Sequence, residues 1–77
     1  MAVVTLIEMH GIGSRALAAV GYDRPSATLR LRFRTGGLYD YFDVPEHIYA
    51  ALVASDHPWT EWGPHITKTY DYQRLDQ

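Results

Sequence analysis

Five side chains near the middle of the chain have the greatest potential for binding chemistry. They are Arg30, Arg32, Arg34, Tyr39 and Tyr41. Guanidinium groups contact phosphates, and tyrosine rings stack on unpaired bases, so this combination suits RNA or single-stranded DNA. Arginine and tyrosine also cover the solvated face of many ordinary sheets. Their spacing therefore raises the question of which face of which element carries them.

The residues around them predict a two-stranded hairpin over residues 27–44. Apolar and charged residues alternate strictly through the first strand, so Leu29, Leu31 and Phe33 share one face and the arginines share the other. Thr35-Gly36-Gly37 supplies the turn, because glycine reaches positive φ at little cost. Residues 38–42 form the return strand.

The length of the turn decides where the tyrosines point. A two-residue loop, either Thr35-Gly36 or Gly36-Gly37, places each arginine opposite an odd-numbered residue of the return strand. With Thr35-Gly36 the pairs are Arg32 with Tyr39 and Arg30 with Tyr41, which makes a ladder of arginines and tyrosines on the outer face. A three-residue loop turns both tyrosines toward the core. We favour the two-residue loop because it is the commonest hairpin connection. The objection to it is that Asp40 then shares the core face.

The rest of the chain predicts further strands and short helices. Residues 3–10 are rich in β-branched and apolar residues and predict a strand. Residues 14–20 fit a helix capped by Ser14, or a strand that continues to residue 22. Asp43 and Glu46 form a potential capping box for a helix that ends near residues 55–58. Gly63-Pro64 interrupts the next segment, so we expect a second helix to begin at Pro64 and residues 70–75 to be extended.

Two tryptophans and the remaining polar residues give no catalytic pattern. Trp59 and Trp62 are expected in an irregular turn, as core anchors or as contacts for a protein partner. The four histidines lack metal-ligand spacing, and no serine lies in a nucleophile motif. We therefore expect no enzyme activity, no cofactor and no metal.

Length and composition limit the classes of fold and function that remain possible. A chain of 77 residues with 47% apolar and 21% charged residues is expected to form one domain over residues 1–77. Its net charge of −2 means that nucleic-acid binding requires a local basic patch. The chain has no cysteine, no apolar stretch of membrane-spanning length and no signal-peptide pattern, so we expect a cytoplasmic protein without a membrane partner.

Several motifs between residues 14 and 75 together resemble one family. They are Val20-Gly21-Tyr22-Asp23, the alternation of Leu29, Leu31 and Phe33, Tyr39-x-Tyr41, Val44-Pro45, Tyr49-x-x-Leu52, His65-Ile66 and Tyr70-x-Tyr72. The chain thus resembles the KTSC domain, a bacterial and phage module named for its occurrence at the C-terminus of some lysyl-tRNA synthetases. Residues 55–62 depart from the family pattern: they lack its glycine and asparagine and are about two residues longer.

The resemblance implies that residues 14–22 are extended, and it associates the family with RNA binding. Together with the residues, it predicts an α+β fold: an antiparallel meander of three or four strands packed by one or two short C-terminal helices. The N-terminal strand, residues 1–13, would extend this core. The expected function is a non-enzymatic module that binds RNA or single-stranded nucleic acid through the hairpin face. The alternative is a protein-interaction adaptor that uses the Trp59/Trp62 loop and a sheet edge.

Overall fold

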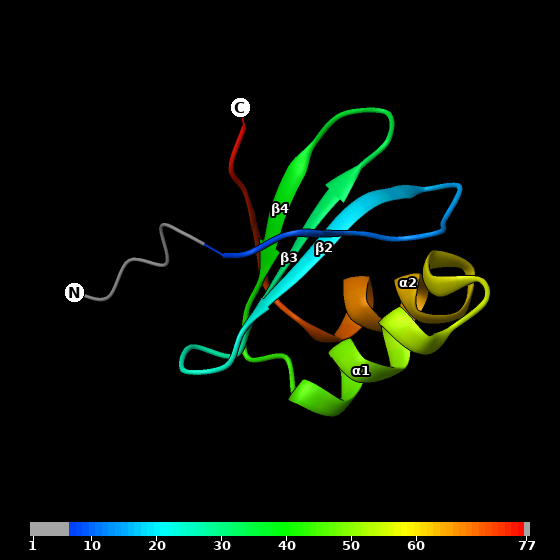
Figure 1. Ribbon diagram of the computed structural model, residues 1–77. Helices are drawn as coiled ribbons and strands as arrows, with labels where there is room; N and C mark the ends of the chain where they lie inside the picture. The colour runs from blue at the N-terminus through cyan, green and yellow to red at the C-terminus, as the bar shows by residue number, and fades with distance from the viewer. Residues whose placement is uncertain (1–6, 77) are drawn as a thin grey trace.

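The fold is an α+β arrangement in which two helices pack on one face of an antiparallel sheet (Figure 1). The computed structural model describes residues 7–76. Within these residues the strands are β1 (His10–Gly11), β2 (Leu17–Asp23), β3 (Thr28–Phe33), β4 (Leu38–Tyr41) and β5 (Tyr72–Arg74). The helices are α1 (Glu46–Ala54) and α2 (Pro58–Thr69), and they connect β4 to β5.

The strands lie in the sheet in their sequence order, and every neighbouring pair is antiparallel. The meander from β1 to β4 uses short turns, and β5 returns beside β4 after the helices. Among residues 7–76 the sheet therefore has five strands, one more than the predicted maximum of four. The predicted extension of residues 14–22 is confirmed for residues 17–22, which lie in β2, whereas residues 14–16 precede the strand. Ser14 caps no helix, but its hydroxyl accepts hydrogen bonds from the backbone N–H groups of Ala16 and Leu17.

The hairpin of β3 and β4 is confirmed, but its predicted two-residue loop is wrong. The backbone N–H of Phe33 donates to the carbonyl of Gly37 at 3.0 Å, which leaves three residues in the loop. Gly36 and Gly37 adopt φ of +103° and +107°, where glycine is favoured. As a result, Leu31 pairs with Tyr39 and Leu29 with Tyr41. Both tyrosines share the core face with the leucines, so the predicted arginine–tyrosine ladder does not form.

The core lies between the sheet and the helices. Its buried residues are Leu17, Val20, Leu29, Leu31 and Tyr41 from the sheet, Val44 from the loop that follows, and Ile48, Leu52 and Ile66 from the helices. Full burial of each leucine or isoleucine contributes about 1.5–3 kcal/mol. Tyr22 also links the layers, because its hydroxyl donates to the carbonyl of Val44 and its ring stacks on Tyr49 of α1.

The opposite face of the sheet holds a buried ion pair. Arg30 lies opposite Asp40 in the β3–β4 register, and two hydrogen bonds of 2.7 and 2.9 Å join the guanidinium to the carboxylate. Their residues are 9% and 4% exposed. Gly21 lies beside Arg30 in the same row. Residues 7–9 cross this row so closely that a Cβ on Gly21 would lie 2.5 Å from the Glu8 carbonyl.

Both helices differ from the prediction at their starts. Pro45 precedes α1 and no side chain caps it, so the capping box of Asp43 and Glu46 is absent. Glu46 instead pairs with Arg24 across the surface. The prediction of a break at Gly63-Pro64 is wrong, because α2 runs without interruption from Pro58 to Thr69 and contains Pro64. The predicted strand at residues 3–10 falls partly outside the described residues, and strand pairing within the rest begins at His10.

Candidate functional site

A groove of about 490 Å³ opens on the helix side of the sheet, between the hairpin, β5 and the C-terminal part of α2. The hairpin projects past the helices, so this part of the core face is not covered by them (Figure 1). The groove is lined mainly by aromatic and hydroxyl side chains, including Phe33, Thr35, Tyr39, Tyr41, Thr67 and Tyr72. We refer to it as the tyrosine groove.

Three tyrosine rings form the wall of the tyrosine groove. Tyr41 pairs with Tyr72 across β4 and β5, and Tyr39 lies two residues along the same face. The ring centroids are 5.5 Å apart for Tyr41 and Tyr72, 5.7 Å for Tyr39 and Tyr72, and 6.4 Å for Tyr39 and Tyr41. Such spacing is typical of interacting aromatic rings. The cluster is therefore held in a fixed arrangement by the strand register.

Exposure rises across this cluster from the core to the solvent. Tyr41 is 4% exposed, Tyr39 is half-buried and Tyr72 is 58% exposed. Burial raises the pKa of Tyr41, because it disfavours the charged form of the hydroxyl. The buried ring thus supports two outer rings whose surfaces reach solvent. An exposed, pre-positioned tyrosine offers a stacking surface at a low cost in conformational entropy.

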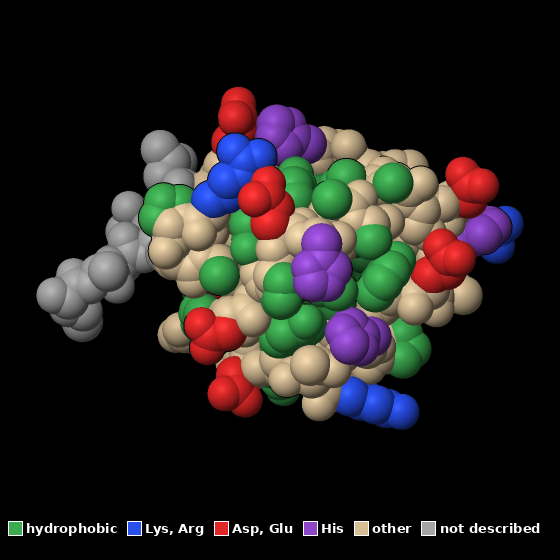
Figure 2. Space-filling model, turned by 90° about the horizontal axis from the view of Figure 1, so that it is seen from below, with side chains coloured by type: hydrophobic (Ala, Val, Ile, Leu, Met, Phe, Trp, Pro, Cys, Tyr) green, Lys and Arg blue, Asp and Glu red, His purple; other side chains and the backbone are tan. Residues whose placement is uncertain are grey.

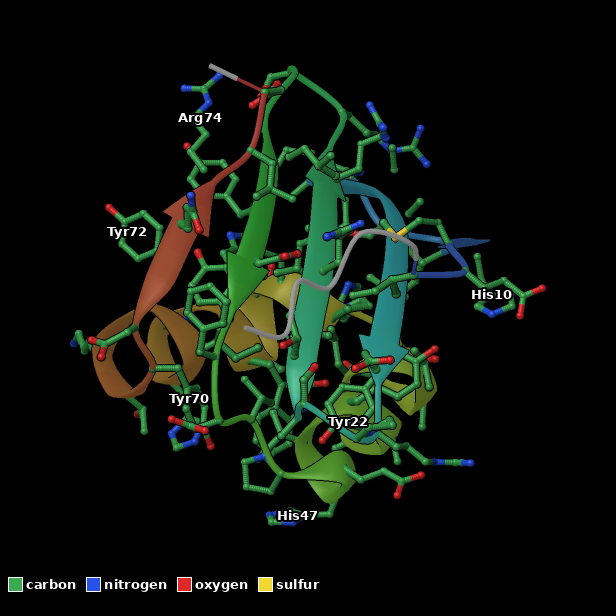
Figure 3. The ribbon with its side chains drawn as sticks, turned by 90° about the vertical axis from the view of Figure 1, so that its left-hand side faces the viewer. His10, Tyr22, His47, Tyr70, Tyr72 and Arg74 are labelled. Carbon is green, nitrogen blue, oxygen red and sulfur yellow. The ribbon has the colours of Figure 1, made fainter. Side chains whose placement is uncertain are left out.

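One cation lies against the tyrosine cluster. The guanidinium carbon of Arg74 is 5.5 Å from the centroid of the Tyr39 ring, within cation–π range. Arg74 also donates to Asp76 at 3.0 Å, and this hydrogen bond raises the pKa of Arg74. Asp76 in turn accepts from the backbone N–H of Leu38, which lowers the pKa of the Asp76 carboxyl. Figure 3 shows Tyr72 and Arg74 projecting from β5 along the same edge of the sheet.

The structure separates the predicted site residues. Tyr39 and Tyr41 lie in the groove, although on the face opposite to the one predicted. Arg30 is buried with Asp40 and cannot serve as a surface contact. Arg32 is exposed on that same far face, and Arg34 is exposed in the hairpin loop, where its Nε donates to the carbonyl of Ser14 at 2.6 Å.

The tryptophans lie on α2 and not in a loop, which corrects their predicted placement. The Trp59 ring contacts Phe33 edge-on with centroids 5.0 Å apart. It also rests on Gly63, where an added Cβ would lie 2.8 Å from the indole. Trp62 is half-buried and contacts His65 at a centroid distance of 5.9 Å. Both rings are therefore packed against the body of the protein.

Sequence reasoning did not select Tyr72 or Arg74. The signal that would have found them is the alternation in the tail, where Tyr70, Tyr72 and Arg74 recur at a spacing of two. A strand there adds to the free edge of β4, and its inward face then continues the row of Tyr39 and Tyr41.

Within the described part of the chain, no charged side chain lines the tyrosine groove, whereas the solvent-facing surface of the helices carries several. Figure 2 shows acidic side chains and histidines scattered around hydrophobic atoms on this side, with few lysines or arginines.

Within residues 7–76, no three His, Cys, Asp or Glu side chains gather closely enough to hold a metal ion. Neither of the described helices has the length and apolar character needed to cross a membrane.

These features define a small α+β domain with an aromatic groove at one sheet edge, and comparison with known proteins gives its family. The family model of the KTSC domain matches residues 13–73. The chain therefore belongs to the KTSC domain family. Residues 7–9, which cross Gly21, lie before the matched range.

Two relatives agree with this assignment. A protein from Tsukamurella paurometabola is 38% identical over 48 residues, which cover 62% of this chain and 72% of that protein. The crystal structure of a KTSC domain protein from Yersinia pestis superimposes with a TM-score of 0.85, over 91% of this chain and 99% of that one. Its sequence identity is 20%, so this second likeness establishes the fold alone.

Proposed function

We propose that this protein is a non-enzymatic module that binds RNA or other single-stranded nucleic acid in the tyrosine groove. The observation that carries the proposal is the exposed ring of Tyr72, which lies beside Tyr39 with Arg74 at the same edge. Stacking of a base on an aromatic side chain contributes about 1–3 kcal/mol and tolerates any base. Arg74 supplies a cation for the phosphate next to the stacked base.

Charge on the hairpin loop supports the same ligand. Arg34, in the hairpin loop, and Arg32, on the far face of β3, are both exposed near the hairpin end, and among the described residues neither forms a salt bridge. The local field at this end is therefore more positive than the net charge of −2 suggests. Aromatic side chains with cations nearby are the usual features of a single-strand site.

Titration of the protein with a fluorescein-labelled uridine hexanucleotide, read by anisotropy, tests the proposal. For a single strand, each neutralised phosphate contributes about −0.7 to the slope of log affinity against log salt concentration. Replacement of Arg74 by Ala should weaken binding and reduce that slope by about 0.7. Arg24→Ala is the matched control, since Arg24 also forms an exposed ion pair, with Glu46, whereas Arg74, paired with Asp76, lies over the Tyr39 ring.

A protein-interaction adaptor is the alternative function. In that case the aromatic groove would hold apolar side chains of a partner, and affinity would depend little on salt. Equal hexanucleotide binding by the Arg74→Ala and Arg24→Ala proteins, or no binding by the native protein at low salt, would refute the nucleic-acid proposal.

A further inference from the structure

A second cavity, of about 400 Å³, lies between the β1–β2 connection and the start of α2. Its lining combines one aromatic ring with side chains of mixed charge: Arg15, Asp56, His57, Trp59 and Thr60. Trp59 forms part of the wall and is half-buried. The cavity is separate from the tyrosine groove, since the two have no lining residue in common.

A continuous row of rings connects the two cavities. From Tyr72 the centroid distance is 5.7 Å to Tyr39, then 5.6 Å to Phe33, then 5.0 Å to Trp59. Phe33 lines the tyrosine groove and Trp59 lines the second cavity. These four residues, here called the aromatic row, come from β5, β4, β3 and α2. The fold thus aligns rings from four separate elements.

Cations lie near both ends of the aromatic row. Arg74 lies over Tyr39 at one end. Arg34 lies near the other end, because its Nε bonds the carbonyl of Ser14, a residue that lines the second cavity. Arg15 follows directly in that lining, and among the described residues neither Arg15 nor Arg34 forms a salt bridge. This distribution of charge matches a polyanion that follows the row.

We infer that the second cavity holds a further base of the same strand, so that the ligand is a single-stranded oligonucleotide longer than two nucleotides that runs along the aromatic row. The inference rests on the proposed function of the tyrosine groove. The carboxylate of Asp56 would repel a phosphate in the cavity, whereas a base edge offers N–H groups, such as N3–H of uracil, that donate hydrogen bonds to a carboxylate. Trp59 supplies the aromatic contact, and Arg15 and Thr60 supply donors to base oxygens and ring nitrogens.

Fluorescence of Trp59 tests this inference. A Trp62→Phe protein retains Trp59 as its only tryptophan, and the uridine hexanucleotide should quench its emission as the anisotropy rises. Trp59→Phe is the matched control, in which the remaining Trp62 should show no quenching. Arg15→Ala is a second test that leaves both tryptophans in place. It should weaken hexanucleotide binding by about 5-fold or more, in line with a contact of 1 kcal/mol, and leave dinucleotide affinity unchanged.

Two outcomes overturn the inference. If the hexanucleotide binds with normal anisotropy but Trp59 emission does not change, the second cavity holds no base, and the function proposed for the tyrosine groove survives. If Arg15→Ala affects dinucleotide and hexanucleotide equally or not at all, the longer footprint is wrong. If neither the dinucleotide nor the hexanucleotide binds, both the footprint and the proposed function are refuted.

Discussion

Removal of the carboxylate of Asp40 should destabilise the protein more than any change at an exposed ion pair. Asp40 is 4% exposed and holds the guanidinium of Arg30 through bonds of 2.7 and 2.9 Å. An Asp40→Ala variant leaves a buried positive charge without this partner, which costs about 3–5 kcal/mol. A chain of 77 residues has a free energy of unfolding of only about 4–12 kcal/mol.

Urea denaturation followed by tryptophan fluorescence measures this loss. With an m-value of about 1 kcal/mol/M, the midpoint should fall by about 3–5 M, so that much of the Asp40→Ala protein is unfolded at low urea. Glu46→Ala is the control, because it removes one partner of the exposed pair with Arg24. An exposed pair contributes about 0–1 kcal/mol, so its midpoint should barely move.

A double substitution separates the ion pair from simple loss of packing. Arg30→Met with Asp40→Leu removes both charges and keeps similar volume, and such replacements of buried pairs are often neutral or stabilising. The double variant should therefore be more stable than Asp40→Ala. If Asp40→Ala loses no more stability than Glu46→Ala, the reasoning about the buried pair is wrong. Because Arg30 is one half of this buried pair, replacing it would change the stability of the protein, and Arg30 is therefore unsuitable for a test of ligand binding.

Two further predictions concern the far face and the core. Gly21→Ala should lower the free energy of unfolding by about 1–3 kcal/mol, because the new Cβ would lie 2.5 Å from the Glu8 carbonyl; unfolding of Gly11→Ala, where nothing lies within 4 Å, is the comparison. Burial raises the pKa of Tyr41 above its ordinary value of 10.0. The neutral ring therefore contributes stability that is complete below about pH 10 and is lost as the pH rises through the higher folded pKa. Tyr41→Phe should flatten the alkaline fall in urea midpoint, and an equally steep fall in both proteins would contradict this.

The hairpin could be predicted from sequence because its first strand alternates without a break from Leu29 to Phe33. Its register could not, because Thr35-Gly36-Gly37 is compatible with loops of two or three residues, and one residue reverses which side chains face the core. Asp40 contained the missing information. A carboxylate on the core face is costly, and the three-residue loop places it opposite Arg30 on the far face instead.

The second helix was mispredicted for a different reason. Gly63 and Pro64 weaken a helix by propensity, but tertiary contacts outweigh them here. Trp59 packs on the bare backbone of Gly63, and Ile66 is fully buried. The regular spacing of Trp59, Trp62 and Ile66 was the stronger signal. The groove itself could not be predicted, because the alternation of Tyr70, Tyr72 and Arg74 indicates a strand but not that this strand pairs with β4 across two intervening helices.

The central claim is that Tyr72 offers a stacking surface for an unpaired base, and paired substitutions at this residue test it most directly. Tyr72 is 58% exposed and lies on an edge strand, so its replacement should leave the fold intact. Affinity for the uridine hexanucleotide should fall about 5- to 150-fold in Tyr72→Ala, the equivalent of 1–3 kcal/mol, and stay near the native value in Tyr72→Phe, which keeps the ring. Equal affinity of the native, Phe and Ala proteins would contradict the account.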